Sequence, residues 1–183
     1  MVENIFVIDG NHTLYERKND NFYINPKAEK VLKQVQKDFS KVIFWQSNDI
    51  DKLRDDILKP SNLIQYFTHI VGYKIQNDFS LGLYIQEIFH NDKKEPIRIG
   101  TNQIAKKNLD LLLKYFNENS KISLNLNDII AIEDGGCSVF YPKESLLQVK
   151  HYTNTEDKDI KRRYAHFPDL ETVYDSVKVL FNI

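Results

Sequence analysis

The chain has 183 residues, 42% of them hydrophobic and 28% charged, which is ordinary for one soluble globular domain spanning residues 1–183. The formal net charge of −1 disfavours nonspecific nucleic-acid binding, which needs a local excess of Lys and Arg. A single cysteine excludes an internal disulfide framework. The absence of a secretion signal or an apolar run of about 18 residues favours a cytoplasmic protein, or one delivered to a cytosol, without a transmembrane segment.

The first apolar segment, residues 5–8, predicts a strand buried on both faces, because four consecutive apolar residues leave no face for solvent. The run stops at Asp9 and Gly10, and the carboxyl ends of strands are where α/β sheets place their ligands. Residues 14–17 and 22–24 flank a turn rich in Asn and Asp, which predicts a projecting hairpin, or flap, over about residues 14–25.

A helix is predicted next, with Asn25 as its N-cap and Pro26 in its first turn. The following strand, residues 41–46, ends in Ser47-Asn48-Asp49. A hydroxyl at a rigid strand end can donate to a phosphate oxygen, although Ser47 or Asp49 could equally cap the next helix. The buried stripes expected on the two helices are Ala28, Leu32, Val35 and Phe39, and then Ile50, Leu53 and Ile57.

The middle of the chain predicts a third strand at residues 69–73 and leaves residues 74–95 open between helix and hairpin. A helix is predicted from about residue 102 to residue 117. Lys106 and Lys107 fall in its first turn, where the helix dipole disfavours cations unless an anion lies in front.

A fourth strand, residues 128–132, ends in Glu133-Asp134 followed by two glycines. Adjacent acids at the end of a buried strand repel each other and are costly to desolvate unless a cation compensates them. A last strand near residues 146–149 and a helix opened by Pro168 close the sheet. The apolar residues expected on that helix are Val173, Val177, Leu180 and Phe181.

These segments resemble the four motifs of the haloacid dehalogenase (HAD) phosphatases, in the same order and over nearly the whole chain. Asp9-x-Asn11-x-Thr13 resembles the first motif, except that most of these phosphatases carry a second Asp where Asn11 stands. Ser47-Asn48 resembles the second motif.

Lys107, with Lys106 as the alternative, resembles the lysine of the third HAD motif, and Glu133-Asp134 resembles the acidic fourth motif. The resemblance implies an α/β, Rossmann-like HAD fold, in which helices flank a central, mainly parallel sheet.

The resemblance also implies a phosphoric monoester hydrolase in which Asp9 is the nucleophile and forms an aspartyl-phosphate. Mg²⁺ would be held by Asp9, Asp134 and the backbone carbonyl of Asn11, with Glu133 a direct or water-mediated partner. The phosphate-binding residues would be Gly10, Ser47, Asn48 and Lys107.

Neither the interval from Asp9 to Ser47 nor that from Ser47 to Lys107 leaves room for a full cap domain. The chain therefore resembles capless members, of the magnesium-dependent phosphatase and RNA polymerase C-terminal-domain phosphatase types. An open site suits a phosphorylated protein, with phosphotyrosine favoured, or another aryl or large phosphoester. Residues that could stack on a phosphotyrosine ring, or simply pack in the core or flap, are Tyr15, Phe22, Tyr23 and Trp45.

Asn11 motivates a second interpretation, because an amide neither protonates a leaving group nor activates water. The chain could be a binding protein that kept the fold but lost turnover, or an active phosphatase engineered at Asn11 to trap its phosphoenzyme. His12 is a substitute base only if the backbone departs from an extended conformation. If the chemistry lies elsewhere, Cys137 is the next candidate nucleophile.

Overall fold

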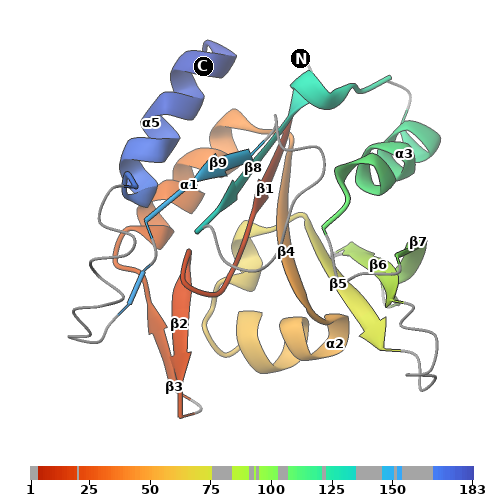
Figure 1. Cartoon of the computed structure of the whole chain (residues 1–183), viewed down its shortest axis with the longest axis horizontal. Helices are drawn as coiled ribbons and strands as arrows, with labels where there is room; N and C mark the ends of the chain where they lie inside the picture. The colour runs from red at the N-terminus through yellow and green to blue at the C-terminus, as the bar shows by residue number, and fades with distance from the viewer. Residues whose placement is uncertain are drawn as a thin grey trace.

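A computed structural model of the protein describes residues 4–19, 21–75, 84–90, 93, 95–102, 107–120, 123–134, 146–150, 152–153 and 167–183. Its centre is a seven-stranded sheet with the strand order β7-β6-β5-β4-β1-β8-β9, and strands β2 and β3 form a separate hairpin (Figure 1). The predicted α/β fold with a central, mainly parallel sheet is confirmed.

Five neighbouring strands of the sheet pair in parallel, and the two strands at one edge pair antiparallel with their neighbours, so that only β6 runs in the opposite direction. The parallel strands, in spatial order, are β9 (Leu146–Gln148), β8 (Ile129–Glu133), β1 (Ile5–Ile8), β4 (Lys41–Asp49) and β5 (His69–Ile75). The antiparallel strands are β6 (Tyr84–His90) and β7 (Ile97–Asn102).

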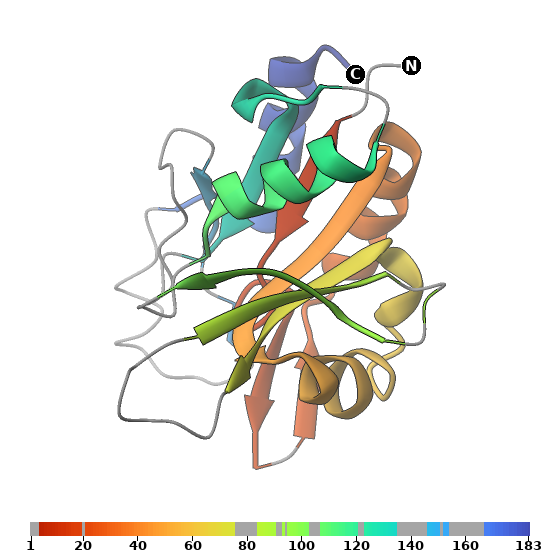
Figure 2. The ribbon, with the colours of Figure 1, turned by 90° about the vertical axis from the view of Figure 1, so that its right-hand side faces the viewer.

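Strand β1 lies at the centre of the molecule, and all four of its residues are fully buried. Phe6 and Ile8 face a core formed with α1 (Ala28–Asp38) and α5 (Leu170–Phe181). Their neighbours Ile5 and Val7 face a second core formed with α3 (Leu109–Asn119) on the opposite side of the sheet (Figure 2). The continuous apolar run of β1 is thus explained by helices on both faces of the sheet.

The hairpin of β2 (Tyr15–Lys18) and β3 (Asn21–Ile24) projects from the edge at which β1 ends (Figure 1), so the predicted flap is confirmed. Asn19 in its turn adopts a left-handed conformation with φ of 49°, which Asn tolerates well.

The first helix begins two residues later than predicted. Its N-cap is Lys27, and the Asn25 side chain instead accepts a hydrogen bond from the Lys27 backbone N–H at 3.0 Å. The next helix begins with one α-helical turn, α2 (Ile50–Lys52), and continues as a π-helical turn over Leu53–Leu58. The stripes predicted for both helices are buried.

Two other predicted boundaries were wrong by several residues. The strand predicted over residues 41–46 continues to Asp49, and the helix predicted from residue 102 begins at Leu109, because residues 97–102 pair with β6 as strand β7. On α5, Leu180 is 66% exposed, not buried, because it lies in the last turn, just before the left-handed Asn182 that ends the helix.

The undecided residues 74–95 contain a hairpin arm, since β5 runs on to Ile75 and pairs antiparallel with β6. Short 3₁₀ turns occupy Ile64–Tyr66 and Leu126–Asp128. Among the described residues, no helix is both long and apolar enough to cross a membrane.

Candidate functional site

The acidic residues predicted at the ends of two strands lie close together, at the carboxyl ends of the neighbouring inner strands β1 and β8. β1 and β8 pair in parallel with Ile8 opposite Ile132, and the Asp9 backbone N–H donates to the Ile132 carbonyl at 3.0 Å. Asp9, just after β1, therefore lies level with Glu133, the last residue of β8, and Asp134 comes one residue later. All three are buried, with exposed fractions of 5%, 1% and 4%.

Lys107 approaches this cluster from the side of the sheet that α3 covers. It directly precedes Asn108, the N-cap of α3, whose side chain accepts from the Asp110 N–H. The Lys107 ammonium is fully buried, donates a hydrogen bond to Asp9 Oδ1 and lies 3.8 Å from Glu133 Oε1. The alternative, Lys106, lies outside the described residues, as does Cys137.

The Lys107 ammonium thus lies against the carboxyl groups of Asp9 and Glu133, and the charge of Asp134 is close enough to act on Asp9. Burial raises the pKa of the Asp9 carboxyl above its ordinary value, and the charge of Asp134 raises it further, while Lys107 opposes both effects. Buried charges are expensive unless they are paired.

The donor set fits a hard divalent cation. The Asp9 and Asp134 carboxylates and the Asn11 carbonyl are oxygen donors, and Mg²⁺ often takes only one or two protein carboxylates and completes its shell with water and substrate oxygens. Within the described ranges, no group of three or more His, Cys, Asp or Glu side chains is arranged to hold a metal by itself. A Mg²⁺ ion would therefore depend on water and phosphate for part of its coordination.

The chain turns tightly after Asp9. The Gly10 carbonyl accepts the N–H groups of Thr13, Leu14 and Tyr15, with the Leu14 bond at 2.8 Å. A Cβ atom at Gly10 would lie only 2.5 Å from the Phe44 ring, so no other residue fits without displacing that ring. The close approach of the Phe44 ring explains why a glycine follows the candidate nucleophile.

His12, within this turn, departs from the extended backbone on which its predicted direction depended, with φ of 61°. Its Nδ1 lies 3.2 Å from the Tyr152 carbonyl, and the Tyr152 N–H donates to the His12 carbonyl at 2.6 Å. Beside this contact is a cavity of about 310 Å³, lined in part by Asn25, Lys27 and Lys150.

The second predicted motif lies on β4. Ser47 is exposed, and its side chain lies beside the Tyr73 phenol, whose pKa burial raises. The Asn48 side chain accepts from the Asp49 N–H at 2.8 Å, and Asp49 is the N-cap of α2. Of the two predicted roles for this segment, helix capping is therefore carried by Asp49.

The sequence did not predict a contact between Tyr15 and Gln46 that lies beside the turn after Asp9. The Tyr15 phenol is 1% exposed and donates to Gln46 Oε1 at 2.5 Å. Burial, and then the negative charge of Asp9, raises the pKa of this phenol well above its usual range. Gln46 Oε1 would lie 2.6 Å from a Cβ at Gly10. The strand register, which pairs Ile8 with Phe44, brings Gln46 to Gly10, and the turn after Gly10 brings Tyr15 to the same place.

The aromatic residues considered for phosphotyrosine stacking divide into two pairs. Trp45 and Tyr15 are buried, so of the two alternatives left open for them, packing in the core is the one that the structure supports. Phe22 is half-buried and packs edge-on against Tyr15, with 5.6 Å between ring centroids, while Tyr23 beside it is also half-buried. Only the flap pair can contact a bound molecule.

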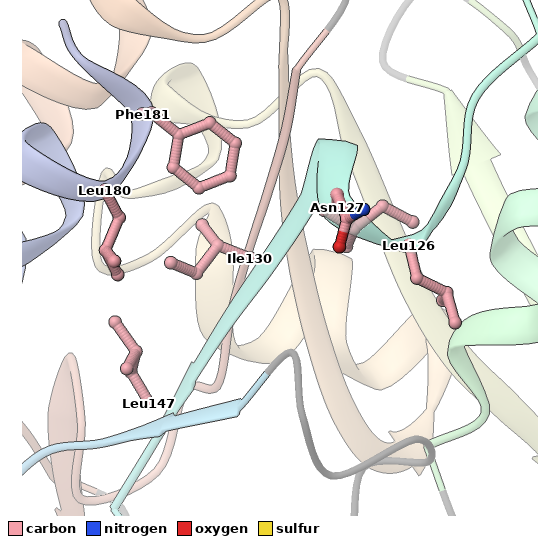
Figure 3. A pocket seen from close by; sticks show the side chains of 7 residues that line it. Leu126, Asn127, Ile130, Leu147, Leu180 and Phe181 are labelled. Carbon is pink, nitrogen blue, oxygen red and sulfur yellow. The ribbon is translucent and has the colours of Figure 1, made fainter.

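A second cavity, of about 300 Å³, lies at the opposite end of β8 from Glu133 (Figure 3). It opens between the start of β8 and the last turn of α5. The residues drawn around it include Leu126, Asn127, Ile130, Leu147, Leu180 and Phe181. Because it lies at the amino end of the strand, it is separate from the acidic cluster.

Comparison with known proteins supports the fold alone. No protein-family model matches the chain, and no curated protein does. Among solved structures, the chain is similar to an uncharacterized protein from Listeria monocytogenes serotype 4b, with a TM-score of 0.50 and 13% sequence identity. The similarity covers 98% of this chain and 99% of that one.

Proposed function

We propose that this protein is a magnesium-dependent phosphatase of the HAD type that hydrolyses phosphoric monoesters through Asp9. The observation that carries the proposal is the buried contact between Lys107 and Asp9, next to Glu133 and Asp134. A carboxylate that must attack an anionic phosphate needs nearby positive charge, and these residues provide one cation and donors for a second.

Each residue then has a definite task. The Asp9 carboxylate attacks phosphorus, the ester oxygen leaves with the alcohol, and water later cleaves the aspartyl-phosphate to release phosphate and restore Asp9. Lys107 reduces the repulsion between Asp9 and the incoming phosphate. Bound Mg²⁺, held by Asp9, Asp134 and the Asn11 carbonyl, would supply further charge neutralisation to the phosphoryl oxygens.

Asn11 should slow the second half of the reaction more than the first. An aryl alcohol leaves with little help from an acid, whereas hydrolysis of the aspartyl-phosphate needs a base to orient and deprotonate water. A protein that binds phosphate but turns over slowly is therefore the second candidate function, and Asn11 is the residue that favours it.

The proposed substrate class follows from the elements that lie between the site residues along the chain. The described residues between Asp9 and Ser47 form the flap and α1, and those between Ser47 and Lys107 form sheet strands and short helical turns. Neither described part contains a separate cap domain. The protein therefore suits phosphoproteins, or aryl and other large phosphoesters, that approach the sheet edge beside the flap.

The test is hydrolysis of p-nitrophenyl phosphate with and without Mg²⁺, using the unaltered chain, Asp9→Asn and Asn11→Asp. The exposed Asp175→Asn on α5 is a matched control. We expect a burst approaching one equivalent of nitrophenol, then a slow phase that Asn11→Asp accelerates at least about tenfold. Asp9→Asn should abolish both phases. Turnover that survives Asp9→Asn would refute the proposed nucleophile.

A further inference from the structure

The cavity at the amino end of β8 lies where the sheet is one strand narrower. β8 begins at Ile129, but β9 pairs only with Ala131, Ile132 and Glu133. Among the described strands, none pairs with Ile129 and Ile130 on the side of β9. The cavity of about 300 Å³ opens at this step, between the start of β8 and the last turn of α5 (Figure 3).

The walls of this cavity are mainly apolar and carry no charge. Six of the seven lining residues are Leu, Ile or Phe, and the seventh is Asn127. An apolar cavity of about 150 Å³ holds a benzene-sized group, so this one has room for about two aliphatic side chains. Apolar side chains of another molecule can therefore fill it without desolvating a charged group.

Exposed apolar side chains gather beside the cavity. Among the described residues, four large hydrophobic side chains are exposed, and three of them belong to the last five residues. Val179 is 80% exposed, Leu180 66% and Ile183 43%. Leu180 also lines the cavity, and the Ile183 N–H donates to the Lys178 carbonyl at 3.1 Å, which holds Ile183 against the end of α5. We call the cavity and these three side chains the α5 patch.

The α5 patch is too large to be ordinary exposed surface. Exposed apolar side chains normally occur singly, whereas an apolar patch of about 300–600 Å² often marks an interaction surface. Three aliphatic side chains exposed to this degree, together with the cavity walls, supply an area near the lower end of that range. The patch therefore favours a partner that covers it.

Two properties of the α5 patch favour a second copy of this chain as that partner. The patch has protruding side chains next to a hollow, and a twofold interface buries the same surface on both molecules, so the projections of each copy can enter the hollow of the other. A twofold axis also brings residues close to their own counterparts, which like charges would oppose. No residue of the patch is charged, and just before it on α5 Lys178 and Asp175 form an ion pair with each other at 2.6 Å.

The size of the α5 patch sets the strength of the association. Two patches of about 300–600 Å² each would bury about 600–1,200 Å² in all. Stable interfaces start at about 1,200 Å², so this one lies at or below their lower limit. A reversible dimer with a dissociation constant in the micromolar range is therefore expected, not a permanent one.

We propose that the α5 patch is the interface of a reversible twofold dimer of this protein, in which Val179 and Ile183 of each copy enter the cavity of the other. The patch lies at the opposite end of β8 from Glu133, so this contact leaves the acidic clusters of both copies uncovered. The dimer does not depend on the proposed phosphatase function.

Sedimentation velocity from about 1 μM to about 1 mM tests the dimer, since an interface of this size associates in that range. The variants are Val179→Glu and Leu180→Glu, each of which places a charge in the patch. Both side chains are mostly exposed, so neither variant should disturb folding, and the fluorescence of the buried Trp45 checks this. The matched control is Gln36→Glu, which adds the same charge at an exposed position of α1.

The unaltered chain should sediment as a monomer at low concentration and as a dimer at high concentration. Gln36→Glu should keep the dissociation constant within about twofold, because it alters only exposed surface. Val179→Glu and Leu180→Glu should each weaken association at least about thirtyfold, because a charge must be desolvated in the interface and lies near its counterpart. A chain that stays monomeric over the whole range, or a dimer that neither patch variant weakens, would overturn the proposal.

A small apolar ligand is the other occupant that the cavity could take, and an apolar fluorescent dye, anilinonaphthalene sulfonate, distinguishes it from a second copy. The dye should bind the monomer, lose affinity in Leu180→Glu and be displaced as the dimer forms. Dye binding that depends on Leu180 but is unaffected by dimer formation would show that the patch is not the dimer interface.

Discussion

Replacing Lys107 with Met tests the electrostatics of the site without any assumption about substrate. Met is apolar and of similar length, so the change mainly deletes a charge. The ammonium is fully buried 3.8 Å from Glu133 Oε1, where one favourable pair interaction is worth about 4 kcal/mol at an effective dielectric constant of about 20. Desolvation of the lysine offsets part of this. Breaking such a buried pair typically costs about 3–5 kcal/mol in net stability.

The free energy of unfolding can be measured by urea titration at pH 7 without divalent cations. The single tryptophan, Trp45, is fully buried and reports unfolding by fluorescence. Lys107→Met should lose about 3–5 kcal/mol, and the loss should be smaller by at least about 1 kcal/mol in the background of Asp9→Asn.

The same loss should shrink as the pH is lowered through the raised pKa of Asp9. The pKa of Asp9 is raised in the folded protein, so the folded state binds a proton more readily than the unfolded chain, and acid relieves the uncompensated charge. A Lys107→Met variant within about 1 kcal/mol of the unaltered chain at pH 7, or a loss that grows on acidification, would refute this reasoning.

Three further predictions concern the metal, a helix cap and the turn after the nucleophile. Mg²⁺ at a hundred times its dissociation constant should stabilise the protein by about 2.7 kcal/mol, which a thermal melt detects as a rise in Tm. Asp134→Asn should remove most of this rise. Asp169→Ala removes the N-cap of α5 and should cost about 1 kcal/mol at pH 7. Lys27 and the Thr172 N–H lower the pKa of Asp169 in the folded protein. The cost of Asp169→Ala, measured by urea titration, should therefore disappear as the pH falls through this lowered pKa. A cost that stays unchanged at low pH would contradict the role of the ionised Asp169 as the cap. Gly10→Ala should cost about 1–3 kcal/mol in urea unfolding, since its Cβ would meet the Phe44 ring at 2.5 Å, and a stable variant would show that the turn can shift.

Much of the architecture was predictable because it is encoded locally. The apolar runs ending at Asp9 and Glu133 predicted two strands, and parallel pairing necessarily brings their ends to one edge. The buried stripes of α1 and α2 followed from helical periodicity. Lys107 was selected through a resemblance, and its burial against Asp9 comes from the chain entering α3 beneath that edge.

The features that could not be predicted from the sequence depend on pairing between segments that are distant along the chain. Strand β7 was not predicted, since its pairing with β6 is not visible in residues 97–102 themselves. The burial of Tyr15 and Trp45, and the contact of Gln46 with Gly10, follow from strand register and from packing on both faces of the sheet. The sequence alone therefore could not distinguish the aromatic residues that are buried from those that could face a ligand.

The most direct test of the central claim is to locate the phosphoryl group. The chain is incubated with p-nitrophenyl phosphate and Mg²⁺, quenched in acid, and the peptide containing Asp9 is analysed by mass spectrometry. The account predicts an acyl-phosphate on Asp9 approaching one equivalent, which accumulates because Asn11 slows its hydrolysis, and which is lost in Asp9→Asn. A phosphoryl group on another residue, or turnover with Asp9 unmodified and replaceable, would contradict it.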